Sequence, residues 1–214
     1  MFADRRDAGR RLAVLVREAV PPSEAPVVLG LPRGGVPVAA EVAAALGAPL
    51  DVFVVRKLGV PGQEELAMGA IASGGVRVLN TEVDAPQDVV AEVQRREQAE
   101  LERRERRYRG DRPAPDVAGR TVVVVDDGVA TGSTARVAAE VTRLRGARRI
   151  VLAVPVGPPD VAERFASVVD EVVCLVRPRG FRAVGAAYDS FEATSDEEVE
   201  EILQAASPPG APAP

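Results

Sequence analysis

Apolar residues along the chain recur in a pattern that predicts alternating strands and helices. Short apolar runs typical of buried strands lie at 26–31, 50–55, 121–125, 149–156 and 168–176. Segments with helical spacing lie between them, at 36–46, 133–144 and 159–166. A strand, a helix and a further strand in succession are typical of a parallel sheet with right-handed crossovers. The pattern therefore predicts an α/β fold with an open, mainly parallel five-stranded sheet flanked by helices.

Further segments add to this alternation. Residues 4–20 have the spacing of an amphipathic helix that ends before two prolines. Residues 66–79 hold a Ser-Gly-Gly turn between two apolar stretches, which predicts a small β-hairpin beside the sheet. Residues 88–109 are rich in Arg, Glu and Gln around a thin apolar stripe, with acids four positions before bases in pairs such as Glu92/Arg96, Glu100/Arg104 and Glu102/Arg106. This spacing favours a solvated helix over a partner-binding one.

The same pattern predicts one domain over residues 1–206. Its core spans about residues 26–176. An irregular aromatic segment starts at 177, and Ser195 with the acids after it predicts the N-cap of a last helix that ends near 206. We expect the segment 177–206 to form a small hood with the C-terminal helix. The tail SPPGAPAP, residues 207–214, is expected to be disordered.

Composition narrows the chemistry. The 214 residues include no His, no Trp and one Cys, which excludes a Ser-His-Asp triad, a His-rich metal site and a disulfide framework. The net charge of −5 does not favour a nucleic-acid partner. No apolar run is long enough to cross a bilayer, and residues 1–11 are too charged for a signal peptide. We therefore expect a cytoplasmic protein without a membrane partner.

The segment VVVVDDGVATGST, residues 122–134, carries the most chemical information. Asp126 and Asp127 follow an apolar strand, at the sheet edge where open parallel sheets bind ligands. A loop with two glycines then leads into a helix N-terminus, whose free N–H groups and nearby hydroxyls suit a monophosphate. Adjacent carboxylates suit a vicinal diol, so the segment predicts a ribose 5-phosphate site. A phosphate loop of the Walker type would need a Lys before Ser133, and the dinucleotide fingerprint is absent.

This segment closely resembles the motif with which type I phosphoribosyltransferases bind 5-phosphoribosyl 1-pyrophosphate (PRPP). The sequence LPRGG at 31–35 resembles the pyrophosphate loop of that family, and VRKLG at 55–59 stands where the family places a basic residue before a mobile loop. The three segments occur in the family's order. The chain is accordingly identified as a type I phosphoribosyltransferase of the bacterial predicted-phosphoribosyltransferase type.

The resemblance implies a role for each matching residue. Asp126 and Asp127 would bind the ribose hydroxyls and, with Lys57, form the catalytic set. The 5-phosphate would be bound by Ala130, Thr131, Gly132, Ser133 and Thr134, and the pyrophosphate by Arg33, Gly34, Gly35 and Lys57. Phe181 and Tyr188 are weaker candidates for contact with the acceptor base, with anchoring of the C-terminal helix as the alternative. The resemblance implies Mg²⁺ bound through substrate oxygens, with no direct protein ligand.

The implied activity is transfer of the 5-phosphoribosyl group from PRPP to a nitrogenous base or related acceptor, with release of pyrophosphate, in nucleotide and nucleoside metabolism. Enzymes of the family that are specific for 6-oxopurines carry an acid at the position of Ala130. Alanine cannot accept a proton, so residue 130 cannot act as a general base. Glu64 or Glu65 could supply a carboxylate that assists the incoming nucleophile. The alternative is that these acids are surface residues at a helix end or turn without a catalytic role. The family commonly forms dimers, so a homodimer is expected. The alternative function is a non-catalytic regulator that senses PRPP or a nucleotide on the same fold.

Overall fold

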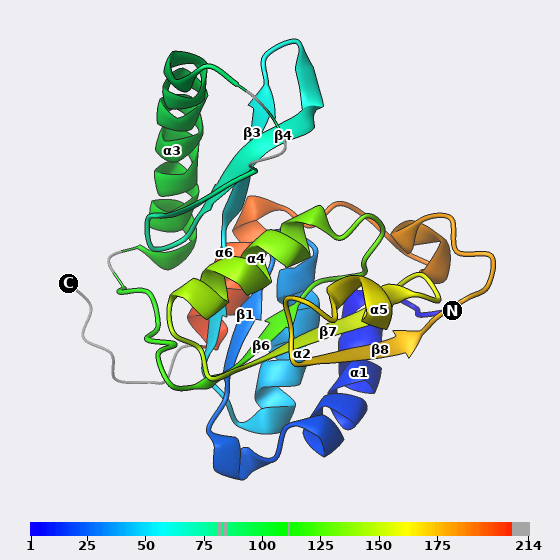
Figure 1. The fold of residues 1–214 in the computed structure, drawn as a ribbon. Helices are drawn as coiled ribbons and strands as arrows, with labels where there is room; N and C mark the ends of the chain where they lie inside the picture. The colour runs from blue at the N-terminus through cyan, green and yellow to red at the C-terminus, as the bar shows by residue number, and fades with distance from the viewer. Residues whose placement is uncertain (81–82, 84, 111, 207–214) are drawn as a thin grey trace.

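The computed structural model describes residues 1–80, 83, 85–110 and 112–206, without the side chains of 64, 65 and 67. The tail 207–214, expected to be disordered, lies outside the described residues. Two sheets organise the described part of the chain (Figure 1). Helices pack on both faces of the larger sheet, and the smaller sheet projects from its edge together with one long helix.

The larger sheet has five parallel strands in the order β2-β1-β6-β7-β8, as the sequence pattern predicts. The strands span Leu50–Val52 (β2), Val27–Gly30 (β1), Thr121–Val125 (β6), Arg149–Val156 (β7) and Glu171–Val176 (β8). Strands β1 and β6 are buried along their whole length, because the sheet is covered on both faces. They are also neighbours, paired from Val27 with Val122 to Gly30 with Val125, so the loops that follow them lie side by side.

The helices form two layers. Helices α1 (Arg5–Ala19), α2 (Gly35–Leu46) and α6 (Asp196–Ala205) contribute to the core on one face of the larger sheet. Helices α4 (Ser133–Leu144) and α5 (Val161–Phe165) pack on the opposite face. The body also contains two short 3₁₀ turns, η1 (Pro22–Glu24) and η2 (Val184–Ala187). Among the described residues, no helix combines the length and the apolar character needed to cross a membrane.

The smaller sheet and the long helix form an arm. Its antiparallel strands are β3 (Val55–Val60), β4 (Gln63–Ala72) and β5 (Val76–Leu79), and its helix is α3 (Gln87–Arg109). The arm extends away from the body of the molecule (Figure 1). A buried ion pair between Arg109 Nε and Asp51 Oδ2, 2.9 Å long, fixes the end of α3 to β2.

One expectation for this region needs correction. The apolar run 50–55 is not one strand: β2 ends at Val52, and Val55 already pairs with Ala72 in the smaller sheet. The backbone N–H of Val54 donates to Ser73 Oγ rather than to a strand of the larger sheet, which marks the transfer. The hairpin expected at 66–79 is confirmed: β4 and β5 form it, and β3 adds a third strand.

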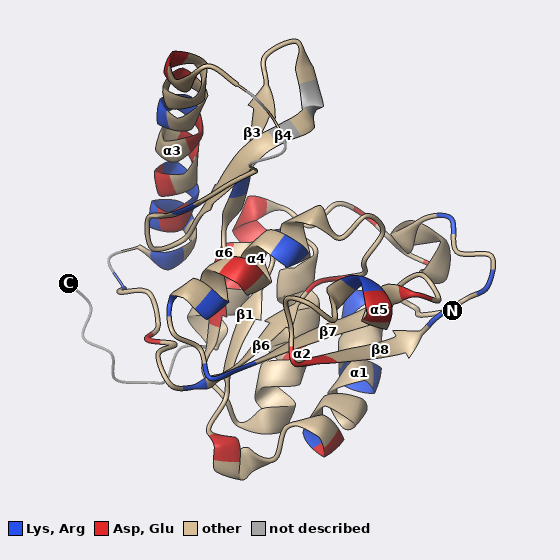
Figure 2. Ribbon diagram, in the orientation of Figure 1, with Lys and Arg blue, Asp and Glu red and all other residues tan. Residues whose placement is uncertain are grey.

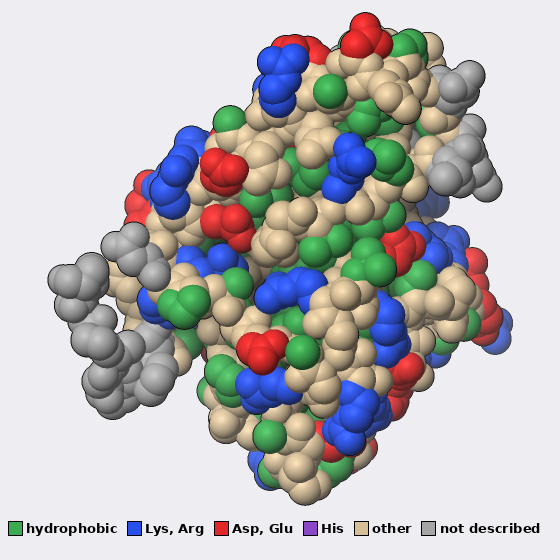
Figure 3. Space-filling view, turned by 60° about the vertical axis from the view of Figure 1, so that its left-hand side comes forward, with side chains coloured by type: hydrophobic (Ala, Val, Ile, Leu, Met, Phe, Trp, Pro, Cys, Tyr) green, Lys and Arg blue, Asp and Glu red, His purple; other side chains and the backbone are tan. Residues whose placement is uncertain are grey.

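Helix α3 is less solvated than its composition predicts. Its apolar stripe is buried at Val93, Leu101 and Tyr108 in the same core cluster as α2 and α6. Of the expected pairs, Glu100 does bind Arg104, but Glu92 binds Arg95, and Glu102 accepts a hydrogen bond from Gln98. The remaining surface of α3 carries acidic and basic residues along its length, and Figure 3 shows both charges interspersed with apolar side chains over that side of the molecule (Figures 2 and 3).

The hood contains an N-terminal part that the sequence pattern did not indicate. We use hood for residues 1–4 together with 177–194. Phe2 forms a bridge with Tyr188, supported by hydrogen bonds from Phe2 N to Ala187 O and from Asp189 N to Phe2 O, both 2.8 Å long. The N-terminal residues therefore meet the segment after β8 beside the carboxyl ends of β7 and β8.

Candidate active site

The acid pair, Asp126 and Asp127, follows β6 directly. The five residues of β6 are buried, so the strand is fixed in the core and delivers the two carboxylates to the carboxyl edge of the sheet. The backbone N–H of Asp127 donates to Asp126 Oδ1 over 2.9 Å. Arg5 Nε, from the first residue of α1, donates to Asp127 Oδ2 over 2.8 Å. A cation that the sequence pattern did not single out therefore belongs to this site.

The environment of the acid pair disfavours two full negative charges. Burial raises the pKa of Asp126 well above its usual value, and the neighbouring charge of Asp127 raises it further. Burial also raises the pKa of Asp127, while the hydrogen bond and the positive charge of Arg5 oppose that rise. The arrangement keeps the two acceptors close together, with one guanidinium to compensate them.

The loop after the acid pair leads into α4. Gly132 is the N-cap residue of α4 and has φ +77°, a left-handed conformation that favours glycine. A Cβ atom there would also stand 2.6 Å from Phe165 Cζ. Within the described residues, the backbone N–H groups of 130–134 donate to no other backbone group, and the residues other than Gly132 are exposed. Ala130, Thr131, Gly132, Ser133 and Thr134 thus offer unpaired N–H groups at a helix N-terminus, an arrangement that could hold an anion, and we call these five residues the anion cradle.

The LPRGG loop, residues 31–35, lies against the acid pair. A Cβ atom at Gly34 would stand 2.0 Å from Asp127 Oδ2, and one at Gly35 would stand 2.7 Å from Val125 O and 2.9 Å from Asp126 Cα. Both glycines are therefore needed because any side chain would push this loop off the acids. The Pro32–Arg33 peptide bond in the loop is cis.

Arg33 extends from the same loop toward α6. Its Nη1 atom lies 3.8 Å from Asp196 Oδ1, and its side chain is 45% exposed. Asp196 also accepts hydrogen bonds from Tyr108 Oη, over 2.5 Å, and from Arg107 Nη1, over 2.8 Å. Burial and the adjacent Asp196 raise the pKa of Tyr108 to about 12. The first residue of α6 thus connects the LPRGG loop with the base of the arm.

Lys57 is not at the carboxyl edge of the larger sheet, where the sequence pattern placed it. It lies in β3, paired in register with Ala70, and is exposed on the arm. It lies three positions beyond Val54, which corresponds to about 10 Å of strand. The two acids considered as an alternative base, Glu64 and Glu65, have side chains outside the described part of the structure.

The hood aromatics divide into two roles. Tyr188 is buried, donates a hydrogen bond to Asp127 O over 2.5 Å, and packs against Phe2 and Phe191 with ring centroids 5.3 and 4.9 Å apart. Burial raises its pKa well above the usual value, so it stays a neutral donor. Phe181 instead lines an apolar cavity of about 280 Å³ with Phe2, Val156 and Val176. Tyr188 anchors the hood to the acid pair, and Phe181 faces space that could take an apolar ring.

The described residues contain no group of three or more His, Cys, Asp or Glu side chains that could form a metal site. A Mg²⁺ ion at this edge would therefore draw most of its oxygen ligands from a bound phosphate compound and from water, which is a common arrangement for this ion. The residues present fit a metal that arrives with its substrate.

The parallel sheet and the loops at its carboxyl edge have the arrangement of the phosphoribosyltransferase fold. The chain belongs to this family, since the family model described as "Phosphoribosyl transferase domain" matches residues 4–189. The chain is similar to the protein TT1426 from Thermus thermophilus, whose crystal structure has a TM-score of 0.83 and 49% sequence identity, over 94% of this chain and 97% of that one. A protein of Aquifex aeolicus, AQ2163, shares the fold at a TM-score of 0.51 and 12% identity, over 95% of this chain and 86% of that one.

The chain is also similar to a curated protein of Mycobacterium tuberculosis that bears the name "Putative phosphoribosyl transferase Rv0571c". The two are 54% identical over 212 residues, which cover 96% of this chain and 47% of that protein. The chain therefore spans about half the length of this curated relative.

Proposed function

We propose that this chain is a Mg²⁺-dependent phosphoribosyltransferase that transfers the 5-phosphoribosyl group of PRPP to a nitrogenous base or related acceptor and releases pyrophosphate. One observation carries the proposal: the acid pair lies between an anion cradle at the N-terminus of α4 and the LPRGG loop, at neighbouring strands of one sheet edge. PRPP has three polar parts: a ribose diol, a 5-phosphate and a pyrophosphate. The acid pair suits the diol, and the two loops beside it suit the two phosphate groups.

The residues divide the substrate between them. The acid pair accepts hydrogen bonds from the ribose hydroxyls, and residues 130–134 donate backbone N–H groups to the 5-phosphate. The backbone of Arg33, Gly34 and Gly35 faces the pyrophosphate. A pyrophosphate contact for Lys57, which lies in β3 of the arm, belongs to the same proposal. An acceptor ring placed toward the hood would lie near the cavity beside Phe181, with Tyr188 behind the acid pair.

The reaction is a displacement at C1 of the ribose. The bond from C1 to the pyrophosphate oxygen breaks, a bond to the acceptor nitrogen forms, and the proton lost by that nitrogen passes to solvent. Mg²⁺, when bound, would neutralise charge on the leaving pyrophosphate. The chain contributes by holding C1 and the acceptor in register and by stabilising charge with backbone amides. The homodimer and the cytoplasmic location stay predictions from the sequence.

The test is a substrate panel with a matched pair of variants. The protein with PRPP, Mg²⁺ and a range of bases should release pyrophosphate with at least one of them. Changing both acids to amides (Asp126→Asn and Asp127→Asn) preserves size but removes the charged acceptors, so turnover or PRPP affinity should fall at least about tenfold. Glu92→Gln, at an exposed ion pair with Arg95 on α3, is the control and should change neither.

The outcomes separate the candidate functions. Tight PRPP binding without turnover for any base would favour a PRPP-sensing regulator. No PRPP binding, or a folded double variant that binds and reacts like the unchanged protein, would refute the proposed site. Gly132→Val tests the other half of the site: it obstructs the cradle beside Phe165 while both carboxylates stay in place, so it should abolish PRPP binding.

A further inference from the structure

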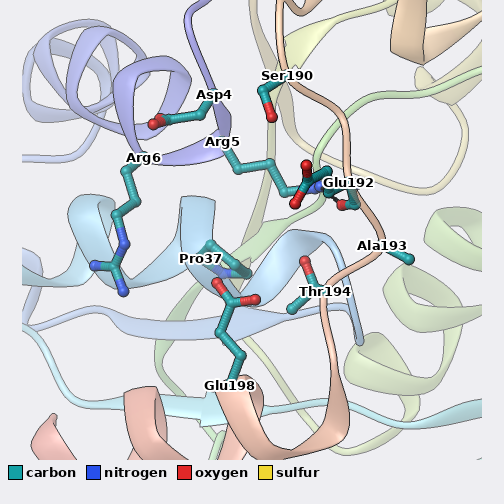
Figure 4. Close-up of a pocket in the computed structure, with 9 residues that line it drawn as sticks. All are labelled: Asp4, Arg5, Arg6, Pro37, Ser190, Glu192, Ala193, Thr194 and Glu198. Atoms are coloured by element: carbon teal, nitrogen blue, oxygen red, sulfur yellow. Dashed lines mark hydrogen bonds between the residues drawn. The ribbon is translucent and has the colours of Figure 1, made fainter.

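Arg5 makes contacts on three sides at the acid pair. Its Nε donates to Asp127 Oδ2 over 2.8 Å, and its Nη1 donates to Glu192 O over 2.6 Å. Its guanidinium carbon also lies 4.0 Å from the centroid of the Phe191 ring. Figure 4 shows the side chain extending from α1 to the hood segment 190–194, beside a cavity of about 200 Å³. Only 12% of the side chain is exposed, so the guanidinium is held rather than solvated.

The contact with Arg5 uses only one of the two carboxylate oxygens of Asp127. Oδ2 receives the Arg5 hydrogen bond and faces Gly34, whose missing Cβ would stand 2.0 Å away. In the described part of the chain, Oδ1 accepts no side-chain hydrogen bond, and 16% of the Asp127 side chain is exposed. An ionised carboxylate has lone pairs on both oxygens, so Oδ1 can still accept from a hydroxyl while Oδ2 is bound.

We propose that Arg5 is a positioning residue for the ribose diol. It locks Asp127 through Oδ2 between α1, the hood and the LPRGG loop, so that Oδ1 and the neighbouring Asp126 face the substrate. This inference rests on the proposed function, since it assigns the acid pair to a ribose. The guanidinium does not need to leave for the sugar to bind, because the diol and Arg5 use different oxygens.

Charge supports the same role. Asp126 and Asp127 are adjacent and largely buried, and among the described residues Arg5 is the basic side chain that bonds either of them. Arg5 opposes the rise that burial causes in the pKa of Asp127. Without that cation the pair would bind protons more readily and would lose acceptors for the diol.

The experiment compares ribose 5-phosphate with 2-deoxyribose 5-phosphate, which differ by one hydroxyl of the diol. Calorimetry gives both affinities for the unchanged protein and for Arg5→Gln, Arg5→Lys and Arg6→Gln. Arg6 is the matched control, because it is the next residue of α1, is half exposed and pairs with Glu41 over 3.6 Å. A structural defect would weaken both sugars alike, whereas loss of the diol acceptor weakens only the ribose.

We expect the unchanged protein and Arg6→Gln to prefer ribose 5-phosphate by about tenfold or more, as for hydrogen bonds to charged groups. Arg5→Gln should lower that preference to about twofold with little change for the deoxy sugar. Arg5→Lys should fall between them, since it keeps the charge but has no fork to reach both Asp127 and Glu192 O. If Arg5→Gln fails to fold, Arg5→Lys carries the same comparison.

Two results overturn the inference, and they are distinguishable. An undiminished ribose preference in folded Arg5→Gln or Arg5→Lys would refute the role of Arg5 while leaving the proposed function intact. Failure of the unchanged protein to bind ribose 5-phosphate or to prefer it over the deoxy sugar would refute the diol site itself, and with it the proposed function.

Discussion

The close approach of Gly34 to the acid pair allows a severe test with a single methyl group. Gly34 has φ −62° and ψ −28°, which alanine adopts without strain, so Gly34→Ala changes sterics and little else in the backbone. The added Cβ would stand 2.0 Å from Asp127 Oδ2 and 2.9 Å from Arg5 Nε. Because a Cβ essentially never lies within 3.0 Å of another heavy atom, the carboxylate and the loop must separate by about 1 Å.

That displacement sets the expected magnitudes. Overpacking costs about 1–3 kcal/mol of stability, offset by about 0.4–1 kcal/mol because alanine restricts the unfolded chain. The variant should therefore stay folded. A displacement of about 1 Å breaks hydrogen bonds between the acid pair and the ribose hydroxyls, and each bond to a charged group is worth about 1.5–3 kcal/mol, or on the order of 10- to 100-fold in affinity. We expect PRPP affinity to fall by that order while the protein stays folded.

The assay is PRPP binding by calorimetry, with thermal unfolding measured in parallel. Gly180→Ala is the control, because a Cβ there meets no atom within 4 Å and its φ lies outside the left-handed range. It should leave PRPP affinity unchanged and should not lower the unfolding temperature, because alanine restricts the unfolded chain here too. A folded Gly34→Ala protein that binds PRPP as tightly as the unchanged protein would refute the assignment of the acid pair and the LPRGG loop to one ligand.

Two further predictions concern the arm and pH. Asp51→Asn should remove one of the two carboxylates that pair with the buried Arg109, the other being Glu105 on α3, and should cost about 1–3 kcal/mol in urea unfolding; a loss below about 1 kcal/mol would show that this ion pair does not hold the arm. Because burial raises the pKa of Asp126, its carboxylate takes up a proton at a pH above the ordinary value of about 3.9. The preference for ribose 5-phosphate over its 2-deoxy analogue should therefore diminish as pH falls toward that raised pKa in calorimetric titrations, and a preference that stays constant down to about pH 4 would contradict it.

Sequence pattern predicted the centre of the fold accurately and its periphery less well. The strands 121–125 and 149–156 and the helix 133–144 have the predicted bounds, because each apolar run is delimited by charged residues or glycine. The run 50–55 gave no sign that the chain leaves one sheet for another after Val52. Phe53 and Val54 are buried at that transfer, so hydrophobicity is continuous where the pairing is not.

In the candidate site, too, some residues could be predicted from the sequence pattern and others could not. The acid pair and the cradle lie in one contiguous segment whose order of residue types carries the chemistry, and so they could be predicted. Arg5 lies 122 residues from Asp127, in a helix whose spacing reports only which face is apolar. The partnership of Phe2 with Tyr188 is equally remote. Contacts of this kind are set by tertiary packing, which local periodicity does not encode.

The joining of residues 1–4 to 177–194 also determines when the site can exist during synthesis. The chain is made from its N-terminus, and contacts between residues remote in sequence form late. The strands β1, β2 and β6 can pair once residue 125 has emerged, but Arg5 must wait for Phe191 and Glu192 before its contacts are complete. A nascent chain that ends between residues 176 and 191 would thus contain all five strands of the larger sheet and the acid pair, but Arg5 would lack its contacts with Phe191 and Glu192. Competence to bind the sugar is then acquired only after residue 192 has been made, when nearly all of the segments that surround the acid pair are present.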